Sequence, residues 1–430
     1  TSPRRRRSSL PPPDVMKRAD LTRRAERALA MQSPCRLCPR ACGARRDRGE
    51  TGFCREGAAA RVFSAAPHFG EEPPLSGTAG SGTVFFSGCT LRCSYCQNHE
   101  FSQGGAGTAV EPDALAGVFL SLERRGCHNL NLVTPTHFLP QILQALALAA
   151  SEGFALPVVY NTSGYESGEA LRLLDGVVDI YLPDMRYGDA DAAARFSGAA
   201  DYPRINRLAV REMWRQVGPL LVDSSGVARR GLIVRHLVLP GGLAGTGAVL
   251  RFLADEISKE ASVSLMSQYT PCFRALGDPV LGRRLTRREF AEAEEALRRS
   301  GLRRGWIQEW SGRASREFLG EELRPGMGGG DKRQWGRRKA DARRSAPGHS
   351  TRLKPVVRDS SRAGPTLAFP PGLESRIMRW DRRRRGGTID ERAFKMGEHQ
   401  AQEGRGGPEA RQGLQQVRPG DQRSGQARRR

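Results

Sequence analysis

Between residues 83 and 300 the sequence alternates between short β-branched or apolar runs and longer stretches with helical periodicity. The short runs have the length and composition of buried strands. Strands and helices in regular alternation predict an α/β fold with a parallel sheet, either an open doubly wound sheet or a partial barrel. The six runs that we expect to form strands are 83–87, 129–134, 157–161, 177–182, 232–239 and 263–267.

Helices are expected in most of the intervals between these runs. Pro112 suits the first turn of the first helix, and Ser167 or Ser163 is placed to cap the third. The fourth interval is longer, and its sequence predicts a hairpin around residues 223–226 as well as a helix. The expected helices are 112–125, 139–152, 168–174, 204–217, 243–259 and 287–300, with a further short one at 21–31.

Positive charge is concentrated at the two ends of the chain. The net charge is +23; residues 1–34 carry 9 Lys and Arg against 3 Asp and Glu, and residues 321–430 carry 27 against 13. The region between them is nearly neutral, so we expect no nucleic-acid partner for it. After about residue 320 few apolar residues remain to offset the entropy of ordering, which predicts disorder. We therefore expect a basic, disordered extension at 1–34, a Cys-rich metal-binding segment at 35–78, a core domain at 79–312 and a basic, disordered tail at 313–430.

The chain has nine cysteines, and seven of them lie in two tight clusters. Clustered thiols in a long chain indicate metal binding instead of disulfides. The longest apolar stretches, such as 142–150, are far shorter than the ~20 residues that a membrane span needs. The arginines at 4–7 are not followed by the apolar segment of a signal peptide. These features predict a cytoplasmic protein with no membrane partner.

The first expected strand is followed by Gly88 and then by Cys89, Cys93 and Cys96, with the spacing C-x3-C-x2-C. Thiolates bind iron–sulfur clusters, and a cubane normally takes four of them. Three thiolates in one loop would leave one iron open, as a catalytic zinc site leaves a position for its substrate. The loop also follows the C-terminal end of a strand, where α/β folds place active sites. A structural zinc site that borrows a fourth ligand, for example His99, is the alternative.

The same residues resemble the signature of the radical S-adenosylmethionine (SAM) superfamily, C-x3-C-x-aromatic-C, with Tyr95 as the aromatic residue. Longer stretches resemble the branch of pyruvate formate-lyase activating enzyme-like iron–sulfur proteins. The resemblance runs from about Cys35 to about Trp310 and leaves both ends of the chain uncovered. It is carried by residues 82–89, 96–98, 129–137, 160–165, 179–184, 235–242 and 267–271.

This resemblance implies a partial (β/α)6 TIM-like barrel of the radical SAM type, with a [4Fe–4S] cluster on Cys89, Cys93 and Cys96. It also implies that SAM binds the open iron and is cleaved by one-electron reduction, giving a 5′-deoxyadenosyl radical that abstracts hydrogen from a substrate. The cofactors supply the chemistry, while the protein positions them in a dry cavity. A reductant such as flavodoxin or ferredoxin is the implied partner, and a protein is one class of substrate.

The resemblance further implies which residues contact SAM. Where activating enzymes end the second strand in a Gly-Gly-Glu-type turn, this chain has Thr-Pro-Thr-His at 134–137, so Thr134, Thr136 or backbone carbonyls would have to substitute. Arg186 stands where those enzymes have a lysine, and it keeps the cation while gaining a bidentate grip on carboxylates. The expected cofactor-binding residues are Asn161, Ser163, Asp184, Arg186, Arg235 and Gln268.

Several of these polar residues also have a purely structural interpretation. Asp184 follows a proline and suits a helix cap, and Arg235 suits a pair with an acid at the rim of the sheet. His137 suits either cofactor contact or a solvated loop. Cys127 and Cys272 are expected to be small, partly buried thiols outside the metal sites.

A second metal site is expected at Cys35, Cys38, Cys42 and Cys54. Four thiolates suit tetrahedral Zn²⁺ or a fully ligated second [4Fe–4S] cluster. The segment is too short to order itself without such a staple. The arginines around it would also suit a small nucleic-acid-binding knuckle.

The sequence thus predicts a radical SAM enzyme that abstracts hydrogen from an unidentified protein or small molecule. Two alternatives stay open at this point. One is an activase of a glycyl-radical enzyme, and the other is a basic, zinc-containing RNA-binding protein with a non-catalytic barrel. Salt-sensitive RNA binding without SAM cleavage would favour the second alternative.

Overall fold

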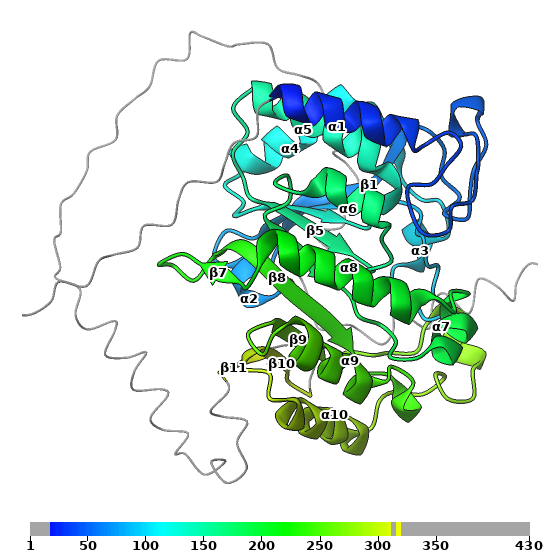
Figure 1. Cartoon of the computed structure of the whole chain (residues 1–430), viewed down its shortest axis with the longest axis vertical. Helices are drawn as coiled ribbons and strands as arrows, with labels where there is room; N and C mark the ends of the chain where they lie inside the picture. Colours follow the sequence, from blue (N-terminus) through cyan, green and yellow to red (C-terminus); the bar gives the residue numbers. More distant parts are fainter. Residues whose placement is uncertain (1–17, 311–314, 320–430) are drawn as a thin grey trace, which may run out of the picture. The chain divides into compact units, whose positions relative to one another are not determined.

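The computed structural model describes residues 18–310 and 315–319 (Figure 1). All six expected strands are present, as β2, β4, β5, β6, β8 and β9, and β7 pairs with β8 in the expected hairpin. The strands are β1 (Ala60–His68), β2 (Ser81–Phe86), β3 (Thr108–Val110), β4 (Leu130–Val133), β5 (Val158–Thr162), β6 (Ile180–Pro183), β7 (Leu221–Val222), β8 (Ala228–Leu237), β9 (Ser262–Met266), β10 (Arg304–Gln308) and β11 (Ser315–Leu319).

Every expected helix is also present. The one expected at 243–259 begins later, at Thr246, because Gly241, Gly242 and Gly245 adopt positive φ angles that suit a turn. The helices are α1 (Arg18–Ala30), α2 (Pro73–Ser76), α3 (His99–Ser102), α4 (Pro112–Arg124), α5 (Leu139–Ser151), α6 (Gly168–Leu174), α7 (Ala190–Ser197), α8 (Tyr202–Val217), α9 (Thr246–Phe252) and α10 (Arg287–Ser300), with short turns η1 (Arg46–Arg48), η2 (Thr136–Phe138), η3 (Pro240–Gly242), η4 (Leu253–Ile257) and η5 (Phe273–Gly277).

The strands form one mixed sheet in the order β11-β10-β9-β8-β6-β5-β4-β2-β1-β3. Neighbours from β10 to β2 along this order are parallel, and β11, β7, β1 and β3 are antiparallel additions. Within the described residues β3 and β11 lie at the two ends of the order and do not pair with each other, so the sheet is open. The α/β class is confirmed, but closure into a barrel is not observed.

The two faces of the parallel strands have different cover. Side chains at alternate positions, such as Val84, Leu132 and Val234, join one large core cluster with residues of α1, α4, α5, α6, α8, α9 and α10. Figure 1 shows α1, α4 and α5 grouped at one end of the molecule, α9 and α10 at the other, and α8 between them. The opposite set of positions, which we call the inner face, includes Val159 and Ile233 and belongs to a separate small cluster.

The short helix α2 covers part of the inner face. Leu75 is fully buried against Val159, Ile180, Ile233 and other inner-face residues. The amide of Asn129, just before β4, donates to the carbonyl of Leu75 at 2.9 Å. The loop that carries α2 is therefore anchored to the inner face by the buried Leu75 side chain and by the hydrogen bond from Asn129.

Two predicted boundaries are wrong. Residues 18–34 were expected to be disordered, but α1 buries Leu21, Ala25 and Ala28 against α5, because this stretch has apolar side chains at helical spacing. At the other end, β11 extends the sheet beyond residue 312 by pairing with β10. Residues 1–17 and 320–430, which contain the remaining predicted disorder, lie outside the described residues.

Candidate functional site

The loop after β2 carries Cys89, Cys93 and Cys96, and we call it the cluster loop (residues 88–96). Gly88 begins it with a φ of 77°, and a Cβ at this position would lie 2.4 Å from Glu56 and 2.9 Å from the Cys54 carbonyl oxygen. Arg92 lies between two of the cysteines with a φ of 53°, which is unusual for a residue with a side chain. The backbone is thus bent tightly, and only glycine fits where it passes the Cys-rich segment.

The three thiols of the cluster loop have different neighbours. Burial raises the pKa of Cys89 to about 11, and the neighbouring Cys93 thiol adds to the rise. Ser197 donates to the Cys93 Sγ at 3.0 Å, and the Cys96 Sγ lies 3.2 Å from the Ser102 hydroxyl. Binding of a metal would therefore have to displace protons from buried thiols.

The arrangement of the three thiols bears on which metal group they can hold. Among the described residues no three His, Cys, Asp or Glu side chains converge on the position of a single metal ion. Three thiolates on a cubane bind three different irons, so they need not converge, whereas a zinc site would require it. His99, the alternative fourth ligand, stacks on Phe273 with ring centroids 4.7 Å apart, and its Nδ1 lies 3.2 Å from the Cys96 carbonyl oxygen. The residues fit a cluster better than a zinc ion.

Tyr95, the aromatic residue of the signature, is buried beneath the loop. Its ring makes edge contacts with Tyr187, Phe196 and Tyr269, at centroid distances of 6.3, 6.5 and 6.0 Å. The Cys272 thiol donates to the Tyr95 carbonyl at 3.3 Å. Aromatic packing of this kind fixes the loop between α7 and the end of β9.

Asp184 and Arg186 lie on the inner face next to the cluster loop. The Arg186 Nη2 is 2.5 Å from the Asp184 Oδ2, and the charge of Arg186 acts on the thiols of Cys93 and Cys96. Burial alone would lower the pKa of Arg186, but Asp184 and then Cys93 raise it well above its usual value. The helix-cap interpretation of Asp184 is wrong, because α7 is capped by Asp189, which accepts from the Ala192 amide at 2.9 Å.

Arg235 in β8 points to the same face and is paired with two acids. Its Nη1 is 3.3 Å from the Glu71 Oε2, and its Nε is 3.4 Å from the Glu72 Oε1. The acid-pair interpretation of Arg235 is therefore observed. Sequence reasoning missed Glu71 and Glu72, because they lie more than 160 residues from Arg235 and precede the short helix α2 without any recognisable motif.

The remaining predicted cofactor residues are at the same edge of the sheet. Asn161 is in β5 on the inner face, next to Ser163, and each is 8% exposed. Gln268 follows β9, where its Nε2 lies 3.7 Å from the Met266 Sδ and its Oε1 accepts from Gln308 at 3.1 Å. Arg235 reaches the same Met266 sulfur at 3.7 Å. The structure therefore places the six predicted residues in or just after β5, β6, β8 and β9, toward the carboxyl ends of these strands.

The turn after β4, residues 134–137, differs from the expectations. Thr134 has a φ of 59°, a strained value for a β-branched residue. Thr136 donates to the Glu166 Oε1 at 2.6 Å, which engages its hydroxyl away from the inner face. His137 is fully buried, its Nε2 lies 2.6 Å from the Ser87 carbonyl oxygen, and burial lowers its pKa to about 3. The solvated-loop interpretation of His137 is wrong, since the ring is a neutral, buried group.

The Cys-rich segment brings Cys35, Cys38, Cys42 and Cys54 close together. The thiol of Cys35 interacts with that of Cys42, and the thiol of Cys38 with those of Cys54 and Cys35. Burial raises the pKa of Cys38 to about 12. The four thiols also do not converge on a single-ion position within the described residues.

Arginines join the Cys-rich segment to the rest of the protein. Arg46 is 2% exposed and donates to the Cys54 Sγ at 3.1 Å and to the His137 carbonyl at 2.8 Å. Arg40 lies over the Phe53 ring at 3.9 Å and donates to the carbonyls of Thr90 and Ser197 at 3.0 and 2.9 Å. These two arginines bind protein groups, which weakens the interpretation of the segment as a nucleic-acid-binding knuckle.

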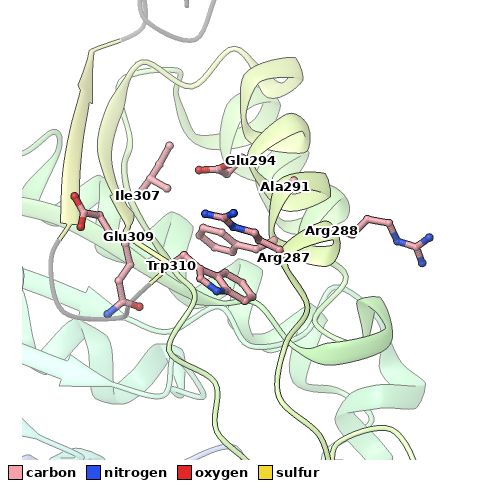
Figure 2. Close-up of a pocket in the computed structure, with 9 residues that line it drawn as sticks. Arg287, Arg288, Ala291, Glu294, Ile307, Glu309 and Trp310 are labelled. Carbon is pink, nitrogen blue, oxygen red and sulfur yellow. The ribbon is translucent and has the colours of Figure 1, made fainter. Parts of the chain in front are cut away.

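A cavity of about 640 Å³ lies elsewhere, between α10 and the end of β10 (Figure 2). Figure 2 shows Glu294 reaching toward Ile307, Arg288 directed away, and Trp310 at the edge. The cavity has no thiol or histidine in its lining. It carries none of the chemistry that the cysteines suggest.

Two comparisons with known proteins bear on the family. The model of the radical SAM superfamily matches residues 83–205, which contain the cluster loop as well as Asp184 and Arg186. The uncharacterized protein MJ0674 of Methanocaldococcus jannaschii is 31% identical over 283 residues, which cover 62% of this chain and 75% of that protein. The chain belongs to the radical SAM superfamily. Membership implies a [4Fe–4S] cluster and SAM as the cofactors of this radical SAM protein.

Solved structures resemble the radical SAM protein more remotely. A radical SAM methyltransferase from Sphaerobacter thermophilus is 16% identical with a TM-score of 0.37, and the match covers 52% of this chain and 65% of that one. The protein anSMEcpe with bound AdoMet is 11% identical with a TM-score of 0.34, over 49% of this chain and 57% of that one. The chain thus spans less than two thirds of each, and we draw nothing from these two matches. No helix in the described part of the radical SAM protein is long and apolar enough to cross a membrane.

Proposed function

We propose that this protein is a radical SAM enzyme of the pyruvate formate-lyase activating enzyme-like branch, with a sheet that curves as a partial barrel. The proposal rests mainly on the cluster loop, whose three cysteines follow β2 and lie next to the charged inner-face pair of Asp184 and Arg186. The seven helices of the large core cluster all pack on the other face, and the short helix α2 alone is described on the inner face, an asymmetry that resembles barrels more than doubly wound sheets. When bound, the [4Fe–4S] cluster and SAM would supply reductive cleavage and a 5′-deoxyadenosyl radical that abstracts hydrogen from a protein or small molecule.

The residues of this chain would bind and orient the cofactors. Cys89, Cys93 and Cys96 would hold the cluster and leave one iron free, because the loop offers no fourth thiolate. Arg186 stays charged, and its planar guanidinium suits a carboxylate such as that of SAM. Asn161 in β5 and Ser163 just after it suit the ribose hydroxyls. The aromatic packing around Tyr95 would exclude water from below the loop.

The direct test is SAM cleavage by the full chain. Protein reconstituted anaerobically with iron and sulfide should absorb broadly at ~400 nm, as thiolate-bound iron–sulfur clusters do, and should bind SAM. After reduction by dithionite or a flavodoxin system it should release 5′-deoxyadenosine, measured by chromatography. A reconstituted protein that holds four irons but releases no 5′-deoxyadenosine would contradict the proposed function.

We also propose that Cys35, Cys38, Cys42 and Cys54 bind a second metal. The support is the gathering of four thiols in a segment whose few large apolar side chains include Leu37 and Phe53. Binding of a structural metal would supply ordering energy on the order of 10 kcal/mol. A closed four-thiolate site needs no redox role, which suits structural Zn²⁺. The four thiols do not converge on one position among the described residues, which suits the separate irons of a second [4Fe–4S] cluster, so we propose one of these two metals.

Elemental analysis distinguishes the two metals. About four irons with one zinc per chain would support zinc, and about eight irons without zinc would support a second [4Fe–4S] cluster. Alkylation of the folded protein supplies the control, since all four thiols should be protected. Four irons, no zinc and four freely alkylated thiols would contradict the second site.

A further inference from the structure

The inner face holds an acid pair that the proposed function does not use. Glu71 and Glu72, in the loop before α2, both approach the guanidinium of Arg235. Their side chains are 6% and 5% exposed, so two carboxyl groups are buried against one cation. The nearest other pair, Asp184 with Arg186, is already balanced within itself. This part of the inner face therefore has one acid more than its cations compensate.

Unpartnered polar atoms lie in the same place. The Glu72 Oε2 has no hydrogen-bond partner among the described residues, and neither do the Nδ2 and Oδ1 atoms of Asn131. Asn131 is fully buried in β4, and its amide is close enough to Glu71 to favour the charged carboxylate, although the two do not meet at hydrogen-bonding geometry. Buried polar groups are nearly always paired in folded proteins. The Arg235 Nε is also without a hydrogen-bond partner, so these donor and acceptor atoms around one acid pair can offer hydrogen bonds to a charged ligand.

The acid pair itself is nearly covered, whereas the charged residues beside it are partly exposed. The side chains of Arg235, Asp184 and Arg186 are 20%, 19% and 27% exposed, whereas Leu75 in α2 is fully buried. Burial raises the pKa of Glu71 to about 7, although Arg235 opposes the rise. A positive charge bound beside Glu71 would favour its ionised form, as salt bridges to buried acids do. The site thus gains both a charge partner and hydrogen bonds from a cationic ligand.

We propose that Glu71, Glu72 and Asn131 form the binding site for a cationic group of the substrate, such as an ammonium or a guanidinium. This inference rests on the proposed function, since it places the substrate between the cluster loop and α2. An ammonium would donate to the free Glu72 Oε2 and the Asn131 Oδ1, and it would neutralise the excess acid. The substrate class would then be amines, or proteins recognised through a lysine or arginine side chain.

The test uses n-butylammonium chloride as the probe and 1-butanol as its neutral counterpart. Binding to the full chain is followed by ligand-observed NMR at constant ionic strength. The wild-type protein should bind the ammonium and not the alcohol. Glu72→Gln should weaken binding of the ammonium about tenfold, since a charge-assisted hydrogen bond is lost. Asp179→Asn is the matched control, because Asp179 is a half-buried acid that accepts from the Val158 amide at 2.8 Å. This variant should bind the ammonium as the wild type does.

Two further measurements keep the outcomes separate. Glu71→Gln should weaken ammonium binding by a similar factor. This second variant tests the inference even if Glu72→Gln does not fold. SAM affinity of the reconstituted variants should stay unchanged. Equal ammonium binding by the wild type and both variants would overturn the inference. A fall in SAM affinity parallel to the fall in ammonium binding would also overturn it, because the bound cation would then be that of SAM itself. If the wild type releases no 5′-deoxyadenosine, the proposed function is contradicted instead. This measurement does not use n-butylammonium, so the two failures can be told apart.

Discussion

The two cysteine regions of this radical SAM protein lie close together but differ in what surrounds them. The cluster loop offers three thiols beside charged residues that solvent reaches, with Arg186 27% exposed. The Cys-rich segment offers four thiols beside Arg46, which is 2% exposed and bonded to a thiol and a carbonyl. Three thiols beside charged side chains that are partly exposed suit a reactive site. Four thiols beside a buried, hydrogen-bonded arginine suit a structural metal site. Neighbouring residues, more than the thiols themselves, separate the two roles.

The largest expected effect is the loss of SAM cleavage when a cluster-loop cysteine is replaced. Cys89→Ala, Cys93→Ala and Cys96→Ala should each abolish 5′-deoxyadenosine release, because two thiolates do not hold a cubane. Cys38→Ala should instead remove the metal of the Cys-rich segment and leave the iron of the cluster loop. Metal content and 5′-deoxyadenosine, measured on the same preparations, check both statements.

Cys127→Ala is the matched control for these variants, because Cys127 is a buried thiol in the core cluster and outside both regions. It should retain both metals and full release of 5′-deoxyadenosine. If Cys38→Ala loses the cluster-loop iron as well, the two regions act as one site. Arg40 and Arg92, which both contact Phe53, would then be the physical link between them.

The contrast between the regions also shows which features a sequence can reveal. The cluster loop is local, with three cysteines on one short turn after a strand, and alternation alone predicted β2 and the five strands that follow the same pattern. The Glu71–Glu72–Arg235 group is assembled from segments far apart in the chain, so no spacing rule could find it. β10 was missed because Arg304 and Gly305 interrupt its apolar run. The burial of His137 depends on packing against Ser87 and Arg46, which only the fold brings together.

A smaller effect is expected from the carboxyl group beneath the Cys-rich segment. Glu166 is buried among the hydroxyls of Thr136, Thr162 and Tyr160, and burial raises its pKa to about 7 in spite of their hydrogen bonds. An unfolded glutamate loses its proton near pH 4.5, whereas the folded one keeps it until about pH 7. Stability should therefore fall as pH rises through this window.

Glu166→Gln removes this contribution while it keeps an acceptor for the hydroxyls. Between pH 5 and pH 8 the free energy of unfolding of the wild type should fall further than that of the variant, by on the order of 3 kcal/mol. Urea unfolding at both pH values, with a chelator present to remove metal, measures the difference. Equal slopes for the two proteins would show that Glu166 ionises normally in the folded state.

The smallest expected effect concerns Asp184 and Arg186, the partly exposed ion pair beside the cluster loop. If Arg186 binds the SAM carboxylate, Asp184→Ala removes the partner that holds the guanidinium at 2.5 Å, and SAM affinity should fall by about 1.5–3 kcal/mol. Arg186→Lys should cause a loss in the same direction, because lysine keeps the charge but not the planar fork. The cluster should persist in both variants, since neither residue is a thiolate. Glu212→Ala, which breaks the exposed pair with Arg215, is the control and should bind SAM normally. Equilibrium SAM binding to the reconstituted proteins measures the effect. If Asp184→Ala retains its iron and binds SAM with unchanged affinity, the pair only stabilises the cluster loop, and other residues bind SAM.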